Sequence, residues 1–372
     1  MRIVHCFRSP VGGIFRHVRD LCEAQAAAGH EVGIVCDSTT GGAFEDRLFA
    51  EIAAKLPLGV ARTPMQRHIG PGDIGAAART LSIIRRMHPD VLHGHGAKGG
   101  VYARLFGTAL RTGRRRVARI YSPHGGSLHY DPGSAAGRFF FGLETLMGRF
   151  TDHIFFVSLY EQHAYERKVG KPRAPASLVY NGLRAAEFTP VADAPDAADF
   201  LYIGMMRDLK GPDLFIDALK EAEKRSGRAL SAVMVGDGND LSKYIAQAQA
   251  LGFGGRIVFH PAMPARKAFA LGRMMVVPSR AEAMPYIVLE ALAAGKPLIA
   301  TAVGGIPEIL GETSPALVRP SVASLAEKMT SALEDEAAYR GLMPPESKLR
   351  ARFGLDVMAA RIEAVYRQTL GS

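Results

Sequence analysis

The chain has 372 residues and a formal net charge of +10, with 48% apolar and 22% charged residues. This length is too great for one typical domain and suits two, and the composition is that of a soluble globular protein. No run approaches the roughly 20 apolar residues of a membrane span, and the start MRIVHCF is too short and too polar for a signal peptide, so we expect a cytoplasmic protein. The three cysteines lack Cys-x-x-Cys spacing, which argues against a disulfide scaffold or a zinc ribbon.

Strands and helices alternate along the first half of the chain. Helices at 15–28 and 74–87 end before Gly29 and Pro89. Strand alternating with helix predicts a parallel sheet with helices on both faces. Apolar strands are expected at 3–6, 32–36, 91–93, 117–121 and 153–157.

A second alternating series follows a Pro-, Ala- and Asp-rich stretch at 189–199, which has the composition of a linker. We therefore predict an α/β protein of two doubly wound domains, with ligands at the carboxyl ends of the strands and thus in the cleft between the domains. The series contains strands at 200–203, 232–235, 257–259, 274–277 and 298–301, helices at 212–226 and 241–251, and a closing helix at about 356–370.

The positive charge is concentrated in the first half of the chain. Up to residue 188 there are 25 Lys and Arg against 15 Asp and Glu, and beyond it 21 against 21. Such a surface can attract an anionic membrane, an anionic acceptor or nucleic acid, or it can be a solvated face. A local cluster contributes most, namely Arg111, Arg114, Arg115, Arg116 and Arg119.

The most informative segment runs from Pro278 to Glu308 and reads PSRAEAMPYIVLEALAAGKPLIATAVGGIPE. It predicts a strand end, a polar elbow, a helix opened by Pro285, and a second strand that enters a Gly-Gly loop. The free amides of a helix N-terminus attract phosphate. Glu282 before this helix and Glu290 inside it can accept hydrogen bonds from hydroxyl groups on either side of a bound diphosphate. A sugar nucleotide has hydroxyl groups in this arrangement. The alternative is a solvated loop glutamate and an exposed helix glutamate.

This segment resembles the signature of retaining nucleotide-sugar glycosyltransferases of family 4 (group 1), which have the GT-B fold. The family pattern is Glu, seven residues, Glu, a small-residue helix, Gly-x-Pro, an apolar strand and Gly-Gly-x-x-Glu. One departure is Met284, Pro285 and Tyr286, where the family usually has Gly-Phe-Gly or similar. The matching residues here are Glu282, Glu290, Gly295, Pro297, Gly304, Gly305 and Glu308.

The resemblance implies two Rossmann-like domains facing across a cleft. Residues 1–188 would bind the acceptor, 189–355 the nucleotide-sugar donor, and helix 356–372 would cross back to the first domain. Arg207 and Lys210, in the loop after strand 200–203, would offset the diphosphate charge, unless they are surface cations without a role. The family's arginine position holds Met205 here. Gly236 ends a strand and would approach the nucleotide base.

Three features of the first half complete the predicted site. Gly12 and Gly13, between the first strand and helix, let a phosphate or an acceptor approach the backbone, but they are not the dinucleotide fingerprint Gly-x-Gly-x-x-Gly. His124 follows the fourth predicted strand and can hydrogen-bond a phosphate or a sugar hydroxyl, and the resemblance places it beside the donor sugar. His93 and His95 have a spacing that suits a metal, but no third ligand is nearby and the family needs none, so we predict no metal site.

The resemblance implies transfer of a hexosyl group from a nucleoside diphosphate sugar, UDP favoured over GDP, to a hydroxyl with retained anomeric configuration. His124, Arg207, Lys210 and Glu282 would be catalytic, and Glu290 would hold the ribose. No side chain stands out as an enzyme nucleophile, so the leaving phosphate itself would help to deprotonate the acceptor. We expect no cofactor and no metal. The remaining donor contacts would come from Gly12, Gly13, Gly236, Pro285, Tyr286 and Ile287.

The acceptor is indicated only by surface character. The basic first half and the apolar run RFFF at 138–141 predict a lipid-linked or anionic glycan acceptor and contact with an anionic membrane. The resemblance implies a role in cell-envelope glycolipid, lipopolysaccharide or polysaccharide synthesis. Two alternatives stay open, a nucleotide-sugar epimerase of the GT-B fold and a non-catalytic basic module that binds membranes or polyanions. Basic and aromatic residues do not interleave, which disfavours nucleic acid as a partner.

Overall fold

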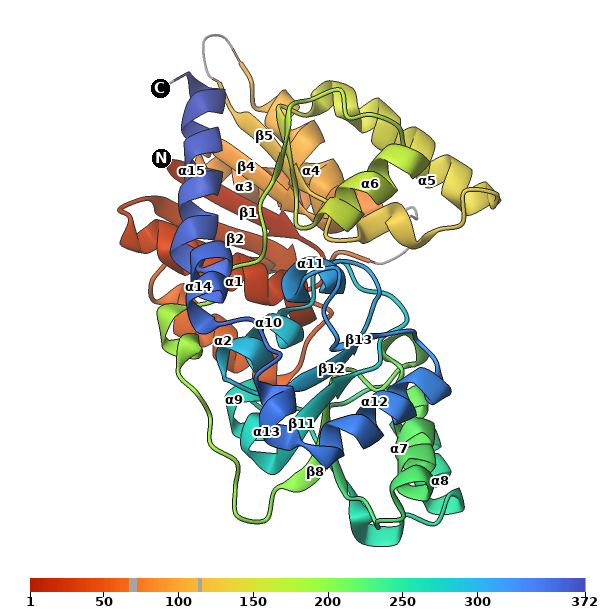
Figure 1. Cartoon of the computed structure of the whole chain (residues 1–372). Coiled ribbons are helices and arrows are strands. Elements are labelled where there is room, and N and C mark those ends of the chain that lie inside the picture. Colours follow the sequence, from red (N-terminus) through yellow and green to blue (C-terminus); the bar gives the residue numbers. More distant parts are fainter. Residues whose placement is uncertain (67–71, 113–115, 372) are drawn as a thin grey trace. The chain divides into compact units, whose positions relative to one another are not determined.

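The computed structural model describes residues 1–66, 72–112 and 116–371 (Figure 1). The chain divides into two compact units, unit 1 with Met1–Gly182 and Leu355–Ser372, and unit 2 with Leu183–Gly354. The predicted boundary at residue 188 is therefore six residues late. The Leu183 amide donates to the Phe353 carbonyl at 2.8 Å, which joins the start of unit 2 to its end before the Pro-rich stretch is reached.

Unit 1 contains a parallel sheet of seven strands in the order β3-β2-β1-β4-β5-β6-β7. Its central strands are buried, as expected for a parallel sheet covered on both faces, and they carry both apolar side chains and buried histidines. The predicted central strands are confirmed, whereas the short edge strands β3 and β7 were not anticipated, because they are largely half-exposed and lack an apolar run. The strands are β1 (Arg2–Phe7), β2 (Glu31–Asp37), β3 (Gly59–Thr63), β4 (Val91–His95), β5 (Ala118–Ser122), β6 (His153–Phe156) and β7 (Ala176–Leu178).

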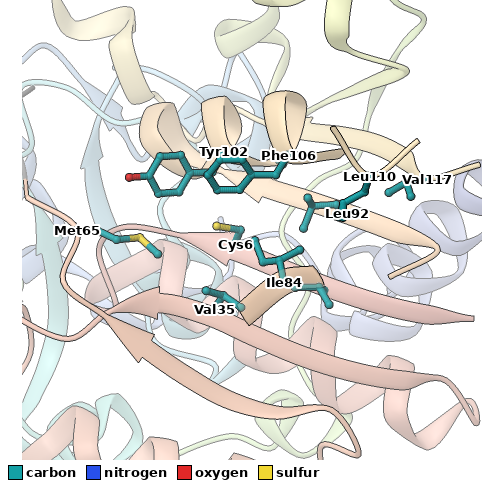
Figure 2. Close-up of a cluster of buried hydrophobic side chains, with 11 residues drawn as sticks. Cys6, Val35, Met65, Ile84, Leu92, Tyr102, Phe106, Leu110 and Val117 are labelled. Carbon is teal, nitrogen blue, oxygen red and sulfur yellow. The ribbon is translucent and has the colours of Figure 1, made fainter. Parts of the chain in front are cut away.

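Helices cover both faces of this sheet. Neighbouring residues of β1 and β4 point to opposite faces, so Ile3 and Val91 pack with α15 while Val4 and Leu92 pack with α3 and α4. Figure 2 shows the second of these clusters, in which Tyr102 of α4 lies with other buried apolar side chains. The helices of unit 1 are α1 (Gly12–Ala27), α2 (Ala43–Ala53), α3 (Gly72–Met87), α4 (Gly96–Ala109), α5 (Ala135–Met147), α6 (Leu159–Lys168) and α15 (Leu355–Leu370).

Unit 2 contains a parallel sheet of six strands in the order β10-β9-β8-β11-β12-β13. The five predicted strands are confirmed, and the two-residue β13 was too short to be recognised. The strands are β8 (Ala198–Ile203), β9 (Ala232–Val235), β10 (Ile257–His260), β11 (Gly272–Val277), β12 (Leu298–Thr301) and β13 (Leu317–Val318). The helices are α7 (Pro212–Ser226), α8 (Leu241–Ala250), α9 (Ala265–Ala268), α10 (Tyr286–Ala293), α11 (Ile306–Leu310), α12 (Val322–Glu334), α13 (Glu336–Arg340) and α14 (Glu346–Phe353).

Each sheet has one point at which the strand order reverses. In unit 1 it lies between β1 and β4, and in unit 2 between β8 and β11. In open parallel sheets, ligands bind outside the carboxyl ends of the strands at such a point. The loops after β1, β4 and β5 and those after β8, β11 and β12 are therefore where a site is expected. No helix in the described part of the chain has both the length and the apolar character of a membrane span.

Candidate active site

In unit 2 the loop after β8 is held against the end of β11. A Cβ at Gly211, whose φ is 68°, would lie 2.2 Å from the Pro278 carbonyl oxygen, so glycine is needed for this close approach. The Arg280 amide donates to the Leu209 carbonyl at 2.9 Å, and the Arg280 guanidinium pairs with Asp213. These contacts place the short 3-10 helix at 208–210 beside the loop that follows β11.

Lys210 and Glu282 form an ion pair at this junction. Lys210 Nζ lies 2.6 Å from Glu282 Oε1, and Ser279 Oγ donates to the same oxygen at 2.7 Å. The Glu282 side chain is only 8% exposed and that of Lys210 22% exposed, so Glu282 is not a solvated loop residue. Both contacts fall on Oε1, and Oε2 makes no further side-chain contact of this kind within the described residues. The structure thus brings together two residues that the sequence predicted separately. It leaves Glu282 Oε2 able to accept a hydrogen bond from a hydroxyl group.

The Gly-Gly loop after β12 supports the Glu282 backbone. Gly304 has a φ of 60°, and a Cβ there would lie 1.8 Å from the Glu282 carbonyl oxygen. The Gly305 amide donates to the Ala283 carbonyl at 3.0 Å, and Thr301 Oγ1 donates to the Ser279 carbonyl at 2.6 Å. The loops after β11 and β12 therefore form one packed assembly, in which Gly304 determines where Glu282 lies.

If Glu282 acts in the reaction that the sequence predicts, Gly304→Ala is expected to lower kcat/KM by about 100-fold, because the added methyl group would displace the Glu282 backbone by about 1 Å or more. The matched control is Gly227→Ala. Gly227 has nearly the same φ, 65°, but nothing lies within 4 Å of its Cβ position. The control should lose about 1 kcal/mol of stability and retain turnover. Equal turnover of the two variants would contradict this role of Gly304.

The N-terminus of α10 differs from the predicted one by a residue. Pro285 is the N-cap, with φ −76° and ψ 120°, and Tyr286 is the first helical residue. Pro285 was predicted as a donor contact, but proline has no N–H, so its backbone nitrogen cannot donate to a phosphate. The amides able to face an anion are those of Tyr286 and Ile287, at the positive end of the helix dipole. Glu290 is half-buried on α10, about one turn further on.

Gly236 has a packing role that the sequence did not reveal. Its φ is 145°, and a Cβ there would lie 1.9 Å from the Gly204 carbonyl oxygen. A Cβ at Gly238 would likewise lie 2.3 Å from the Met206 carbonyl oxygen. These glycines seat the loop after β9 on the loop after β8. Arg207, in that second loop, is exposed and makes no side-chain ion pair within the described ranges.

In unit 1, His124 occupies a strained turn after β5. His124 and Gly125 both have left-handed backbone conformations, with φ of 51° and 76°, and for a residue with a side chain this costs about 1–2 kcal/mol. The buried Glu161 carboxylate holds the turn, because it accepts from the Gly125 amide and, at 2.9 Å, from the Val157 amide. His124 Nε2 lies 3.0 Å from His95 Nδ1. The turn therefore directs this imidazole toward β4.

His124 belongs to a cluster of five imidazoles, which the sequence did not predict. Ligand nitrogens of His5, His93 and His95 lie within 4.8 Å of one another, and so do those of His17, His95 and His124. The premise that His93 and His95 lack a third ligand is therefore wrong, and either triad could hold a metal ion. The available signal was β1, where His5 lies opposite His93 on the neighbouring strand.

Burial keeps these imidazoles neutral. It lowers the pKa of His5 and of His17 to about 4, although hydrogen bonds to the Gln25 and Asn181 oxygens oppose the shift. It also lowers the pKa of His93, His95 and His124 well below the usual range, and the neighbouring imidazoles add to this effect. At neutral pH each ring therefore carries one proton and one lone pair.

Gly12 and Gly13 lie exposed at the start of α1. Gly12 has a φ of 64°, nothing lies within 4 Å of its Cβ position, and Val11 at the N-cap offers no side-chain cap. An anion could approach these backbone amides without obstruction.

Asn181 contacts the histidine cluster. Its Oδ1 lies 3.1 Å from Nδ1 of His17 on α1, so Asn181 orients this histidine.

Two arginines of the predicted basic cluster form ion pairs. Arg111 and Arg119 both pair with Asp152, which neutralises part of their charge. Arg116 is exposed, and Arg114 and Arg115 lie outside the described residues. Arg111 and Arg119 therefore join the segment after α4 and strand β5 to the start of β6 through Asp152.

Known proteins resemble the chain over both units. Residues 11–187 match the sequence profile of glycosyltransferase family 4, and residues 185–354 that of the group 1 glycosyl transferases. Glycogen synthase of Mycobacterium tuberculosis is 25% identical over 383 residues, which cover 96% of this chain and 91% of that protein. The chain belongs to family 4, the group 1 glycosyl transferases, and is a glycosyltransferase.

Two solved structures show the same fold. The Anabaena protein HepE in complex with UDP-glucose has a TM-score of 0.80 and 17% identity, covering 98% of this chain and 99% of that one. WaaG, a glycosyltransferase involved in lipopolysaccharide biosynthesis, has a TM-score of 0.70 and 16% identity, with both chains covered completely. The two parallel-sheet units are thus those of the GT-B fold, which confirms the predicted fold class.

Proposed function

We propose that the chain transfers a hexosyl group from a nucleoside diphosphate sugar, with UDP favoured, to an acceptor hydroxyl with retained configuration. The observation that carries this proposal is the Lys210–Glu282 pair, which the Gly304 loop supports at the strand-order reversal of unit 2. Support for a UDP-sugar donor comes from HepE, which was solved with UDP-glucose.

In this mechanism, unit 2 stabilises the leaving group. Negative charge develops on the diphosphate as the glycosidic bond breaks, and a fixed cation and oriented amides stabilise it most where water is excluded. Lys210 supplies the cation, Arg207 can add a second one from its exposed position, and the α10 amides of Tyr286 and Ile287 receive a phosphate. Glu282 accepts hydrogen bonds from hydroxyl groups of the transferred sugar, and Glu290 accepts them from the ribose.

The remaining steps need no enzyme-bound intermediate. The leaving phosphate helps to deprotonate the acceptor on the same face of the sugar, which retains the configuration. We keep His124 as the group of unit 1 that hydrogen-bonds the donor sugar. Lys210 and the α10 amides can supply the positive charge, so the proposed reaction does not require a metal.

Sugar nucleotides should stabilise the folded protein. A ligand present at 100 times its dissociation constant stabilises by about 2.7 kcal/mol. A thermal-shift screen with UDP-, GDP- and ADP-glucose should therefore raise Tm most with the UDP sugar, and Lys210→Ala should remove the rise. Products are then analysed with and without an acceptor. An epimerised sugar nucleotide formed without acceptor would favour the epimerase instead. If none of the sugar nucleotides raised Tm, the proposed donor site would be rejected.

The acceptor is assigned to a lipid-linked or anionic glycan at an anionic membrane surface, with the chain bound peripherally on the cytoplasmic side. An exposed aromatic group on and beside α5 supports this assignment. The ring centroids of Tyr130 and Phe140 lie 4.6 Å apart and those of Phe139 and Phe140 5.4 Å apart, and Phe139 is 58% exposed. Leu146, two turns further along α5, is 47% exposed. Apolar side chains with basic neighbours such as Arg138 suit the lipid interface.

The double variant Phe139→Ser, Leu146→Ser should bind anionic liposomes at low salt about tenfold more weakly than the parent chain, because two side chains that would enter the interface are lost. Sedimentation with vesicles measures the bound fraction. The control is Leu342→Ser in unit 2, where the leucine is 44% exposed. Binding that is equal in all three proteins, or absent in the parent, would contradict the membrane assignment.

A further inference from the structure

A continuous hydrogen-bonded chain connects α1 with the His124 turn inside unit 1. Gln25 Oε1 lies 2.8 Å from His5 Nε2, His5 Nδ1 lies 2.9 Å from His95 Nε2, and His95 Nδ1 lies 3.0 Å from His124 Nε2. Gln25, His5 and His95 are at most 1% exposed. The chain therefore runs from a buried amide through two buried rings to the partly buried His124.

The directions of the three hydrogen bonds between Gln25 and His124 depend on one another. A neutral imidazole has one N–H and one lone pair, so a ring that donates on one side must accept on the other. Protons can thus be arranged in only two ways, all pointing toward Gln25 or all pointing toward His124. The group at the Gln25 end decides between them, because it is the member whose donor and acceptor atoms are chemically different.

The Gln25 amide is oriented with its oxygen toward His5. Its nitrogen is buried and makes no hydrogen bond among the described residues, so the Gln25 side chain contacts the imidazoles through its oxygen. Since the Gln25 oxygen accepts from His5 Nε2, His5 Nδ1 accepts from His95, and His95 Nδ1 accepts from His124 Nε2.

We propose that Gln25 is a positioning residue that, through His5 and His95, keeps the His124 proton on Nε2 and presents Nδ1 as a hydrogen-bond acceptor. His124 Nδ1 makes no hydrogen bond among the described residues, so its lone pair is available to a ligand. An acceptor suits a hydroxyl group and repels a phosphate oxygen. If the proposed function holds, on which this last step rests, His124 selects a sugar hydroxyl, and the alternative of a phosphate contact is removed.

The test observes the protons directly and needs no substrate. Long-range ¹H–¹⁵N spectra of ¹⁵N-histidine-labelled protein at pH 7.5 distinguish protonated from bare ring nitrogens, and the spectrum of His124→Gln assigns the His124 signals. The parent chain should show His124 with its proton on Nε2. A proton on Nδ1, or an equal mixture of both forms, would overturn the proposal without any need for the Gln25 and His95 variants.

Two variants interrupt the hydrogen-bonded series from Gln25 to His124 at different places. Gln25→Met removes the amide from one end, and His95→Phe removes the middle ring. Each should convert the single His124 form to a mixture and lower kcat/KM about tenfold with an unchanged fold by circular dichroism. The control Gln162→Met changes a glutamine on α6 whose amide nitrogen donates to Glu166 on the same helix at 3.1 Å. This control should change neither readout. A single unchanged His124 form in Gln25→Met would refute the role of Gln25.

Two further outcomes separate this proposal from its rivals. If the His124 form behaves as expected but no sugar nucleotide is turned over, the proposed function fails and the proton arrangement stands. Zn²⁺ is added to the parent chain as the second probe. A stoichiometric loss of the His5 and His95 N–H signals would show that the imidazoles form a metal site, and it would overturn the hydrogen-bonded chain.

Discussion

Lys210→Ala is expected to lower kcat/KM for sugar transfer by about 10³-fold, the cost of removing one fixed charge-stabilising group from a transition state. Lys210 is the cation that contacts Glu282, and the two are brought together by loops from different strands. Initial rates with a UDP sugar measure the effect. The matched control is Lys243→Ala, since Lys243 also pairs with a carboxylate, Asp208, but is exposed. Near-normal turnover of Lys210→Ala would remove this residue from the site.

Loss of activity could also follow from misfolding, because Lys210→Ala leaves the little-exposed Glu282 carboxylate without its counter-ion. The double variant Lys210→Met, Glu282→Gln removes both charges and keeps similar volumes. It should have a Tm close to that of the parent chain and still be inactive. If the double variant regained activity, the pair would be structural and the proposed mechanism would be wrong.

Lowering the pH from 7.5 to 5 is expected to destabilise unit 1 strongly. The pKa of His5 and of His17 is about 4 in the folded chain, while an ordinary histidine has about 6.5. Below pH 6.5 these histidines therefore bind protons in the unfolded chain but not in the folded chain. The free energy of unfolding falls as the pH falls and levels off near pH 4. At pH 5 each of these two histidines should cost about 2 kcal/mol.

Three carboxylates with lowered pKa values lose their stabilising effect at a lower pH than these histidines. Hydrogen bonds from arginine and lysine lower the pKa of Glu223 to about 2, and the pKa values of Asp37 and Asp152 are also lowered, so these groups titrate below pH 4. Urea unfolding followed by circular dichroism measures the effect. His5→Asn should flatten the pH dependence, whereas His163→Gln, at an exposed position, should not. A free energy of unfolding that stays constant from pH 7.5 to 5 would contradict the neutrality of the cluster.

Local sequence determined the secondary structure wherever burial was complete. Central strands such as 232–235 and 298–301 were located from apolar runs, because a strand covered on both faces carries few polar residues. Edge strands are half-exposed and short, so β3, β7 and β13 left no comparable pattern. The helix start at Pro285 was placed one residue early because helix boundaries depend on backbone angles that composition does not specify.

The sequence by itself determined the family, the two α/β units and the identities of Lys210, Glu282 and Gly304, because these depend on motifs that are contiguous in the chain. The tertiary structure alone decided which of them touch. Lys210 and Glu282 are 72 positions apart, and a contact of that kind requires two strands to lie side by side. The histidine cluster is the clearest case, since β1, α1, β4 and the loop after β5 each contribute to it. Single histidines in separate elements carry no common signal until the sheet assembles them.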